Sequence, residues 1–278
     1  MDSEPAASRY SPAVALEFFK AAGRPEKVAA GSAFFSENEK ARPLLLKRDK
    51  MYLLLDGEVD LMARRKVIGT LRKGQIFGEM APITHAPRSA AAVARTPCRV
   101  IALDDRQFQN GLRQKPGFAL MLMSVMIGRL RETTARLAAA DALHAEAALE
   151  AASVFDPKRL AQLAEGLSSD PPVYFDRRKP IVQEGQVGLR MYAVLEGTVT
   201  VSVGGEAVER LGPGGVFGEL ALIEQAPRAA SVVAETDCSL LPLSRDAFLL
   251  MVKTNTDFAA SLLASLAERL RALTARLK

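Results

Sequence analysis

The sequence predicts an α+β fold of two tandem jelly-roll-like β-barrels, each flanked by helices and followed by a long helix. Residues 51–137 recur 140 positions later without an insertion, so that Cys98, for example, recurs as Cys238. Each copy contains short apolar runs separated by glycine-containing turns, which is typical of antiparallel strands. Each copy ends in a long stretch with apolar residues at steps of three and four, which indicates a helix. We therefore expect one domain over residues 11–145 and a second over residues 146–278.

The strands are expected between an N-terminal helix and the long helix of each copy. Ser11 is a candidate N-cap and Pro12 suits a first helical turn, so we expect the N-terminal helix over residues 11–29. A hairpin with its turn at Asp56-Gly57 opens the clearest strand region. The expected β regions are the hairpin over 51–62, strands over 66–71, 90–94 and 99–103, and a second barrel over 173–243.

Three further helical stretches are expected, over 104–151 with a break at Pro116-Gly117, over 153–166 and over 245–278. The two long ones have apolar stripes with heptad spacing, which favours a coiled-coil seam over a plain core contact. The seam could join the two helices of one chain, giving a monomer with an internal pseudo-dimer, or join two chains as a homodimer. The stripes are Met123, Met126, Leu130, Thr133 and Leu137, and then Leu263, Leu266, Leu270, Leu273 and Leu277.

The composition is that of a globular protein with a core. The chain has 278 residues, of which 49% are apolar and 25% charged. Two cysteines cannot form a disulfide framework, so we expect buried free thiols of an intracellular protein. The start of the chain is acidic and polar, and no apolar run approaches the roughly 20 residues that span a bilayer. We therefore expect a cytoplasmic protein with no membrane partner.

The sequence offers no constellation for catalysis or metal binding. His85 and His144 are the only histidines, and neither has a cysteine or carboxylate at ligand spacing. No Gly-x-Ser-x-Gly motif or other nucleophile with a basic partner occurs. We therefore expect no enzyme activity, no metal and no cofactor. The net charge of +5 comes from scattered residues, so nucleic-acid binding is disfavoured.

The most informative stretch is residues 217–231. Glu219 and Arg228 lie nine positions apart, separated by an apolar run and a turn at Gln225-Ala226-Pro227. The guanidinium of an arginine suits a phosphate, and a glutamate can accept a hydrogen bond from a sugar hydroxyl. The stretch therefore suggests a ribose that carries a phosphate. A plain structural ion pair is the alternative, but residues 77–91 repeat the pattern, which makes that reading less favourable.

Phe217-Gly-Glu-Leu-Ala-Leu-Ile and Pro227-Arg-Ala-Ala-Ser-Val resemble the phosphate-binding cassette of the cyclic nucleotide-binding family, as in protein kinase A regulatory subunits and bacterial catabolite activators. The resemblance implies that the glutamates hold the ribose 2′-hydroxyl and the arginines hold the cyclic phosphate, helped by backbone amides. For the first site it implies contacts from Gly78, Glu79, Met80, Ala81, Pro87, Arg88, Ser89, Ala90, Thr133 and Thr134. For the second site it implies contacts from Phe217, Gly218, Glu219, Leu220, Ala221, Pro227, Arg228, Ala229, Ala230 and Thr274.

The same resemblance favours cyclic AMP over cyclic GMP as the ligand. Ala229 and Ser89 follow the two arginines, where cyclic GMP-selective kinases tend to have threonine. The stretch Gly128-Arg-Leu-Arg-Glu-Thr-Thr is similar to the part of the bacterial activators whose hydroxyls contact adenine across a dimer. Ligand contact with the threonines of the long helices would then order or reposition those helices.

The sequence also departs from the family pattern. Pro82 stands where a leucine is usual and would shorten the cassette helix, which puts the affinity of the first site in doubt. No helix-turn-helix follows Lys278, so DNA is not expected as a partner, and no kinase pseudosubstrate precedes the first barrel. The chain is thus interpreted as a non-catalytic cyclic nucleotide receptor acting on an unknown downstream protein. The alternatives are a scaffold with one or both sites degenerate and, less favoured, a nucleic-acid-binding regulator.

Overall fold

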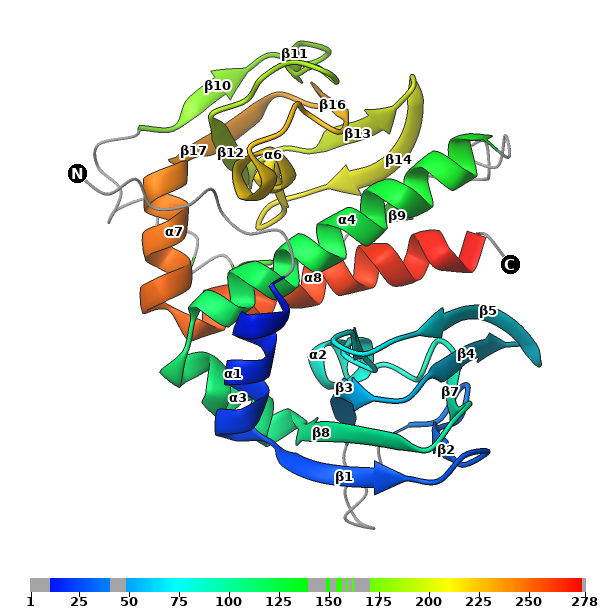
Figure 1. The fold of residues 1–278 in the computed structure, drawn as a ribbon. Coiled ribbons are helices and arrows are strands. Elements are labelled where there is room, and N and C mark those ends of the chain that lie inside the picture. The colour runs from blue at the N-terminus through cyan, green and yellow to red at the C-terminus, as the bar shows by residue number, and fades with distance from the viewer. Residues whose placement is uncertain are drawn as a thin grey trace. The chain divides into compact units, whose positions relative to one another are not determined.

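The computed structural model describes residues 11–40, 49–139, 149–150, 154–156, 159, 162 and 171–276. The chain divides into two compact units, Tyr10–Phe118 and Ala119–Lys278, which we call the first and the second unit. Each unit contains β-sheets with helices beside them (Figure 1). Within the residues described, no helix combines the length and the hydropathy needed to cross a bilayer.

The first unit contains two four-stranded antiparallel sheets, ordered β1-β8-β3-β6 and β2-β7-β4-β5. A core that includes Tyr52, Leu54, Val59 and Val100 lies among these strands. The sheets have separate edges, so the closed barrel expected from the sequence is corrected to a sandwich of two open sheets. The strands are β1 (Arg24–Val28), β2 (Ala33–Phe35), β3 (Lys50–Asp56), β4 (Val59–Ala63), β5 (Lys66–Leu71), β6 (Ile76–Phe77), β7 (Ala91–Ala94) and β8 (Cys98–Asp104).

The second unit repeats this arrangement, with sheets ordered β10-β17-β12-β15 and β11-β16-β13-β14-β9. Its additional strand, β9 (Leu149–Glu150), lies parallel to β14 at the sheet edge. The repeat predicted from the 140-residue offset is therefore confirmed at the level of topology. The other strands are β10 (Val173–Phe175), β11 (Pro180–Val182), β12 (Arg190–Glu196), β13 (Val199–Val203), β14 (Glu206–Leu211), β15 (Val216–Phe217), β16 (Ser231–Ala234) and β17 (Cys238–Ser244).

The N-terminal helix is shorter than the sequence suggested. Helix α1 (Pro12–Ala22) begins as expected, because the Ser11 hydroxyl accepts a hydrogen bond from the backbone nitrogen of Val14. The prediction of a helix as far as residue 29 is wrong. Gly23 is extended and caps the helix, and the following β1 pairs along β8. A proline at position 25 also disfavours a helical conformation of the residue before it.

The helix after each sheet pair is interrupted in both copies. In the first copy, α3 (Asp105–Gln114) and α4 (Gly117–Ala139) flank the break expected near Pro116, and Asp104 caps α3 in a capping box with Gln107. In the second copy the expected single helix is instead α7 (Arg245–Thr254) and α8 (Thr256–Arg276). Asn255 is extended, and its side-chain oxygen accepts a hydrogen bond from the backbone nitrogen of Phe258, which starts the new helix.

Two expectations fall partly beyond the residues described. The helix expected as far as residue 151 reaches Ala139, residues 140–148 lie outside the description, and residues 149–150 form β9. The short helix expected over residues 153–166 lies mostly outside the described residues.

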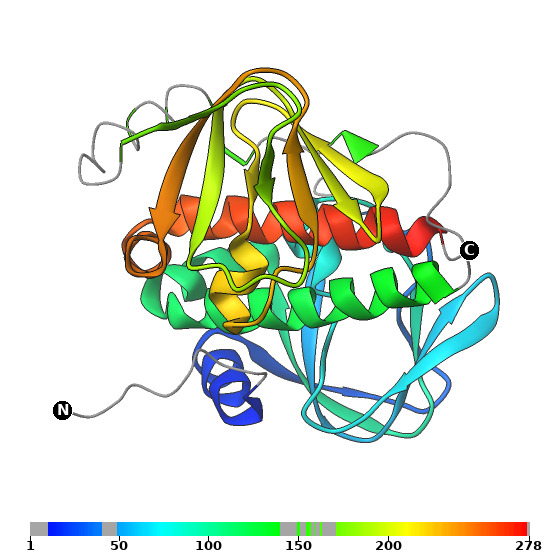
Figure 2. The same ribbon diagram turned by 90° about the horizontal axis from the view of Figure 1, so that it is seen from above.

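Helices α4 and α8 run side by side in the second unit, as the two views in Figures 1 and 2 show. The leucines and methionines of their apolar stripes within the described residues are buried, as the heptad spacing predicted, whereas Thr133 is half-buried. Leu137, Leu263 and Leu266 have no exposed surface, and Leu130 and Leu270 are each 6% exposed. Residue 277, the last of the second stripe, lies outside the described part.

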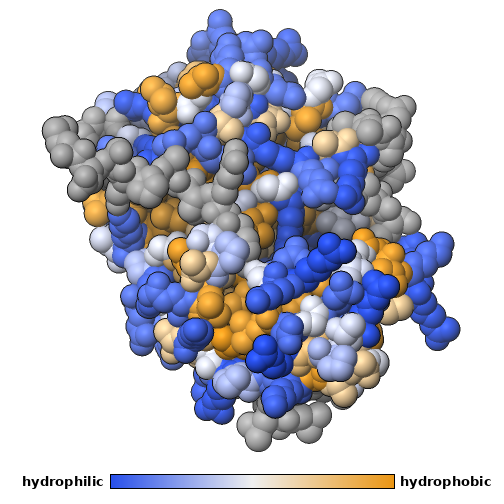
Figure 3. All heavy atoms as spheres, in the orientation of Figure 1, coloured by the Kyte–Doolittle hydropathy of each residue, from blue (hydrophilic) through white to orange (hydrophobic). Residues whose placement is uncertain are grey.

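Outside the cores, hydrophilic residues are interspersed with smaller apolar areas on the face drawn in Figure 3. The two cysteines, Cys98 and Cys238, are buried free thiols, as expected from the sequence. The sulfur of each donates to backbone carbonyls, Cys98 to Glu58 and Cys238 to Thr198. These repeated contacts indicate a packing role for both thiols.

Candidate ligand-binding site

A cavity of about 560 Å³ lies in the second unit. Its walls come from strands β11, β13, β14 and β16, from the cassette around α6 (Glu219–Glu224), and from helices α4 and α8. Valine side chains of the strands make much of the wall apolar, and charged side chains from the cassette and the two helices also line it. A volume of this size is within the range of small-molecule sites, about 300–1,000 Å³.

Arg228 lines the cavity and is held by backbone carbonyls. Its Nη1 donates to the carbonyl of Gly218 at 2.9 Å and its Nη2 to that of Arg190 at 2.5 Å. The side chain is 8% exposed, and a Cβ added at Gly188 would lie 2.0 Å from its Nε, so the neighbouring loop leaves no spare room. Burial lowers the pKa of Arg228, the nearby Tyr192 and Glu219 oppose this shift, and a guanidinium stays charged at neutral pH.

Glu219, the first residue of α6, is paired with Arg269 of α8 and not with Arg228. Nη1 of Arg269 donates to Oε1 of Glu219 at 2.6 Å, and Nη2 donates to the carbonyl of Val216 at 2.8 Å. Glu219 follows Gly218, whose φ of 83° is a backbone conformation that glycine adopts at little cost. The ion pair considered from the sequence, between Glu219 and Arg228, is therefore replaced by one that ties the cassette to α8.

A second buried carboxylate also contacts Arg269. Oε1 of Glu209, from β14, lies 2.8 Å from Nε of Arg269. Glu209 and Glu219 are 8% and 1% exposed, so the three side chains form a buried carboxylate–guanidinium–carboxylate cluster. Burial would lower the pKa of Arg269, but the two carboxylates outweigh this and raise it. The cluster carries one more negative than positive charge if both carboxylates are ionised.

The pKa of Glu209 gives a testable pH dependence. Burial raises the pKa of this carboxyl above its ordinary value of 4.5, although Arg269 acts in the opposite direction. A carboxyl with a raised pKa in the folded state favours folding below the unfolded value and loses that contribution as the pH rises through the folded value. We therefore expect Glu209→Gln to gain stability relative to the wild type as the pH rises from the ordinary carboxyl value of 4.5 towards neutral pH, measured as the difference in melting midpoint. A difference that stays constant or shrinks over this range would contradict the assignment.

The first unit repeats the anchoring of the arginine. Nη1 of Arg88 donates to the carbonyl of Gly78 at 2.7 Å, and Nη2 donates to that of Lys50 at 2.8 Å. Two contacts are additional: Asp49 lies 3.5 Å away, and the guanidinium carbon sits 4.1 Å from the centre of the Phe35 ring. Burial lowers the pKa of Arg88, opposed by Asp49. Arg88 is therefore held more firmly than Arg228, which has Leu189 at the position matching Asp49.

The cassette helices of the two copies differ slightly. Helix α2 (Met80–Thr84) has five residues and includes Pro82, whereas α6 has six. Each helix ends at a left-handed residue, His85 and Gln225 respectively. The expected shortening is therefore one residue, because a proline near the start of a helix replaces a backbone N–H that has no partner within the helix.

The structure brings most of the predicted second-site residues together. Thr274 is an exception, because its hydroxyl donates to the carbonyl of Leu270 at 2.7 Å and Leu273 lines the cavity in its place. Pro227 contributes a carbonyl to a contact with Arg131 of α4. The predicted residues that line the cavity are Phe217, Gly218, Glu219, Leu220, Ala221, Arg228, Ala229 and Ala230.

The residues assigned to the first site separate into two groups. Thr133 and Thr134 lie on α4, in the second unit, and Thr134 lines the cavity described above. Their assignment to the first site stays a prediction. The residues of the first-copy cassette lie on or beside α2 in the first unit: Gly78, Glu79, Met80, Ala81, Pro87, Arg88, Ser89 and Ala90.

Sequence reasoning missed the charged residues that surround the second cassette. Arg269 could have been noticed, because Arg129 occupies the matching position in the first long helix. For Glu209 the only signal in the sequence is that the two copies differ at this position, because its counterpart in the first copy is Gly69. Neither position indicates from the sequence alone that strand β14, α6 and α8 meet at one guanidinium.

Comparison with known proteins assigns the family. A model described as the cyclic nucleotide-binding domain matches residues 25–115 and 172–255, which is more than half of the chain, and each match contains one cassette. The chain belongs to the cyclic nucleotide-binding domain family. A curated relative, the cAMP-dependent protein kinase regulatory subunit of Eremothecium gossypii, is 31% identical over 201 residues. The match covers 72% of this chain and 39% of that relative, so the chain spans well under half of its length.

Solved structures of similar proteins include the regulatory domain of Toxoplasma gondii PKA with cAMP, at 22% identity and a TM-score of 0.32, covering 86% of this chain and 85% of that one. The catabolite activator protein of Thermus thermophilus is 32% identical, with a TM-score of 0.38, and the match covers 44% of this chain and 59% of that one. The family assignment rests on the sequence matches. The chain thus contains two tandem cyclic nucleotide-binding domains, and both its matched ranges and its length of similarity relate it to a part of such regulatory subunits. Regulatory subunits and these binding domains are non-catalytic, in agreement with the expectation that the chain is not an enzyme.

Proposed function

We propose that this protein is a cyclic nucleotide receptor that binds cyclic AMP in preference to cyclic GMP. The observation that carries the proposal is the convergence of Arg228, Glu219 and Gly218 on one cavity of about 560 Å³. A cyclic nucleotide presents a singly charged phosphate, a ribose hydroxyl and an apolar-faced base. The cavity offers a charged guanidinium, a carboxylate and a largely apolar wall for these three parts.

The phosphate would lie against Arg228. Its guanidinium is already oriented by two carbonyls, so little side-chain freedom is lost when the ligand binds. The ribose 2′-hydroxyl would donate to Glu219, which keeps its ion pair with Arg269 through Oε1 and has a second oxygen for the ligand. The base would then occupy the part of the cavity lined by the strand valines and by Thr134.

The preference for cyclic AMP rests on the resemblance of the cassettes. Ala229 and Ser89 follow the arginines, and neither is the threonine that cyclic GMP-selective kinases tend to carry. The curated relative with the matched domains is described as cAMP-dependent, which supports the same ligand class.

Helix movement is the proposed output of binding. Arg269 joins the cassette of the second site to α8, so a ligand on Glu219 changes the charge environment of a residue on that helix. The buried stripes of α4 and α8 support packing of the two helices within one chain, as in an internal pseudo-dimer. A downstream protein would read the position of these helices.

A thermal-shift screen of the full chain with cyclic AMP and cyclic GMP tests the proposal. Ligand that binds only the folded state should raise the melting midpoint by about 5–10 °C at a concentration of 100 times the dissociation constant. We expect the larger rise with cyclic AMP. AMP, which has no cyclic phosphate, is the matched control. No rise with either cyclic nucleotide would favour the alternative of a scaffold with degenerate sites.

A further inference from the structure

Helix α4 forms part of the wall of the second site, although it follows the first sheet pair in the chain. Leu130, Arg131, Thr134 and Ala135 all line the cavity. The last three of these residues follow Leu130 by one, four and five positions, so all four lie on one face of the helix. They also lie between the two ranges matched by the family model, residues 25–115 and 172–255. The cavity is therefore completed by a segment that lies outside both ranges matched by the family model.

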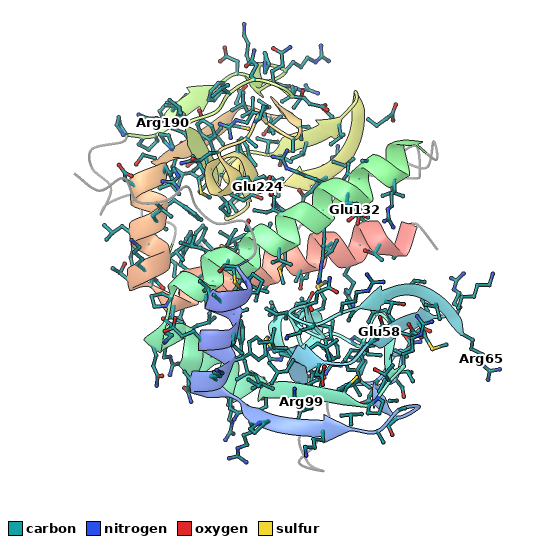
Figure 4. The ribbon with its side chains drawn as sticks, in the orientation of Figure 1. Glu58, Arg65, Arg99, Glu132, Arg190 and Glu224 are labelled. Carbon is teal, nitrogen blue, oxygen red and sulfur yellow. The ribbon has the colours of Figure 1, made fainter. Side chains whose placement is uncertain are left out.

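Arg131 attaches this face of α4 to the cassette. Its Nε lies 2.7 Å from Oε2 of Glu224, and its Nη2 donates to the carbonyl of Pro227 at 3.3 Å. Figure 4 labels Glu224 on α6, close to the course of α4. Glu224 ends α6 and Pro227 directly precedes Arg228, so one guanidinium contacts both ends of the turn that carries the arginine of the site.

The contact is partly shielded from water. The side chain of Arg131 is 33% exposed and that of Glu224 is 21% exposed. Burial raises the pKa of Glu224, and the charge of Arg131 opposes this shift. A pair in this setting is screened less than a pair on the open surface, so its loss should have a measurable effect.

The 140-residue repeat does not reproduce this ion pair in the first copy. The counterpart of Arg131 in the second copy is Arg271, but the counterpart of Glu224 in the first copy is Thr84. Thr84 carries no charge, and its hydroxyl donates to the carbonyl of Met80 at 2.9 Å. The difference provides a matched pair of substitutions, because Glu224→Thr installs the residue that the chain itself uses at the equivalent position.

We propose that Arg131 is a positioning residue of the second site, which fastens α4 to the Glu224–Pro227 turn so that a ligand in the cavity and α4 hold each other in place. This inference rests on the proposed function, because it takes the cavity to be a cyclic nucleotide site. The coupling is reciprocal: if docking of α4 strengthens ligand binding, ligand must strengthen docking of α4 by the same factor. Occupancy of the second site is then reported by the helix that follows the first sheet pair, in addition to α8.

A purely structural role for Arg131 makes a different prediction. If the ion pair only packs α4 on α6, the helix is held equally well with and without ligand. The ligand dependence of α4 is therefore the quantity to measure. Amide hydrogen exchange measures it locally, because exchange slows where a segment opens less often.

The experiment compares the full chain with and without saturating cyclic AMP, and in parallel with cyclic GMP. In the wild type we expect slower exchange in the cassette, in α8 and in the part of α4 around Arg131. In Arg131→Ala and Glu224→Thr, we expect ligand to protect the cassette and α8 but no longer α4. Affinity at the second site should fall about three- to tenfold, as expected for loss of a partly buried ion pair. Arg271→Ala is the control and should retain the α4 response.

Exchanging the charges of Arg131 and Glu224 distinguishes loss of their ion pair from a folding defect of either single variant. The double variant Arg131→Glu/Glu224→Arg should recover most of the ligand-dependent protection of α4 that either single change removes. If ligand protects the cassette and α8 of the wild type but leaves exchange in α4 unchanged, the role of Arg131 is overturned while the receptor function remains intact. Loss of α4 protection in Arg271→Ala to the same extent as in Arg131→Ala would also overturn it. No protection of the cassette by either nucleotide would overturn this inference together with the proposed function.

Discussion

Replacing Arg228 with alanine is expected to weaken cyclic AMP binding at the second site by about 10- to 100-fold. In the proposed complex the guanidinium is the cation that holds the phosphate, and each charge-assisted hydrogen bond to such a group contributes about 1.5–3 kcal/mol. The two carbonyls that now accept from Arg228, those of Gly218 and Arg190, would also lose their donor. Titration calorimetry of the variant measures the loss.

Arg228→Lys provides the matched control for charge. Lysine keeps one positive charge but cannot donate to two carbonyls and a phosphate in the same plane. We expect its affinity to lie between those of the wild type and Arg228→Ala. Arg88→Ala should leave binding at the second site unchanged, because Arg88 belongs to the other cassette. Equal affinity of Arg228→Ala and the wild type would remove Arg228 from the ligand site.

Replacing Arg269 with methionine is expected to destabilise the protein by about 3–5 kcal/mol, which corresponds to roughly 10 °C in melting midpoint. The substitution keeps much of the side-chain volume but leaves Glu209 and Glu219 buried without their cation. Two carboxylates in this position repel each other and have lost their contact with water. Thermal unfolding without ligand measures the effect.

Neutralising the carboxylates distinguishes this electrostatic explanation from a loss of packing. In the variant Arg269→Met/Glu209→Gln/Glu219→Gln, no buried charge of the cluster is left unpaired. Replacing a whole buried ion cluster by neutral groups is often neutral or stabilising, so we expect the triple variant to recover most of the lost stability. A triple variant as unstable as Arg269→Met would show that the guanidinium acts mainly through its packing.

The repeated architecture could be predicted from the sequence, because similar residues recur at a fixed offset of 140 positions. The offset that pairs Cys98 with Cys238 also pairs the cassettes, and the topology of the two sheet pairs follows the same order. The burial of the helix stripes could likewise be predicted, since steps of three and four place Leu130 and Leu137 on one face.

Features that depend on tertiary contacts could not be predicted. The end of α1 is set by the pairing of β1 with β8, and a local apolar pattern does not contain that information. The break at Asn255 arises because its side-chain amide caps α8. An asparagine within an apparently continuous helical pattern does not indicate this role. The prediction of closed barrels was wrong, because an alternating strand pattern does not indicate whether the edge strands of two sheets pair with each other.

The candidate site was predicted where one segment supplies it and missed where several segments meet. Glu219 and Arg228 lie in a single cassette with recognisable spacing. Arg269, Glu209 and Arg131 reach the same cavity from α8, β14 and α4, over large distances along the chain. Their charges can be read from the sequence, but their convergence depends on the fold.

The central claim is that the chain binds a cyclic nucleotide in the cavity at Arg228. Titration calorimetry of the full chain with cyclic AMP and with cyclic GMP tests this most directly, because it yields ligand identity and stoichiometry together. The account predicts saturable binding of one to two molecules of cyclic AMP per chain, weaker binding of cyclic GMP, and loss of the second-site component in Arg228→Ala. No saturable heat with either nucleotide, over a range in which the protein remains folded, would contradict it.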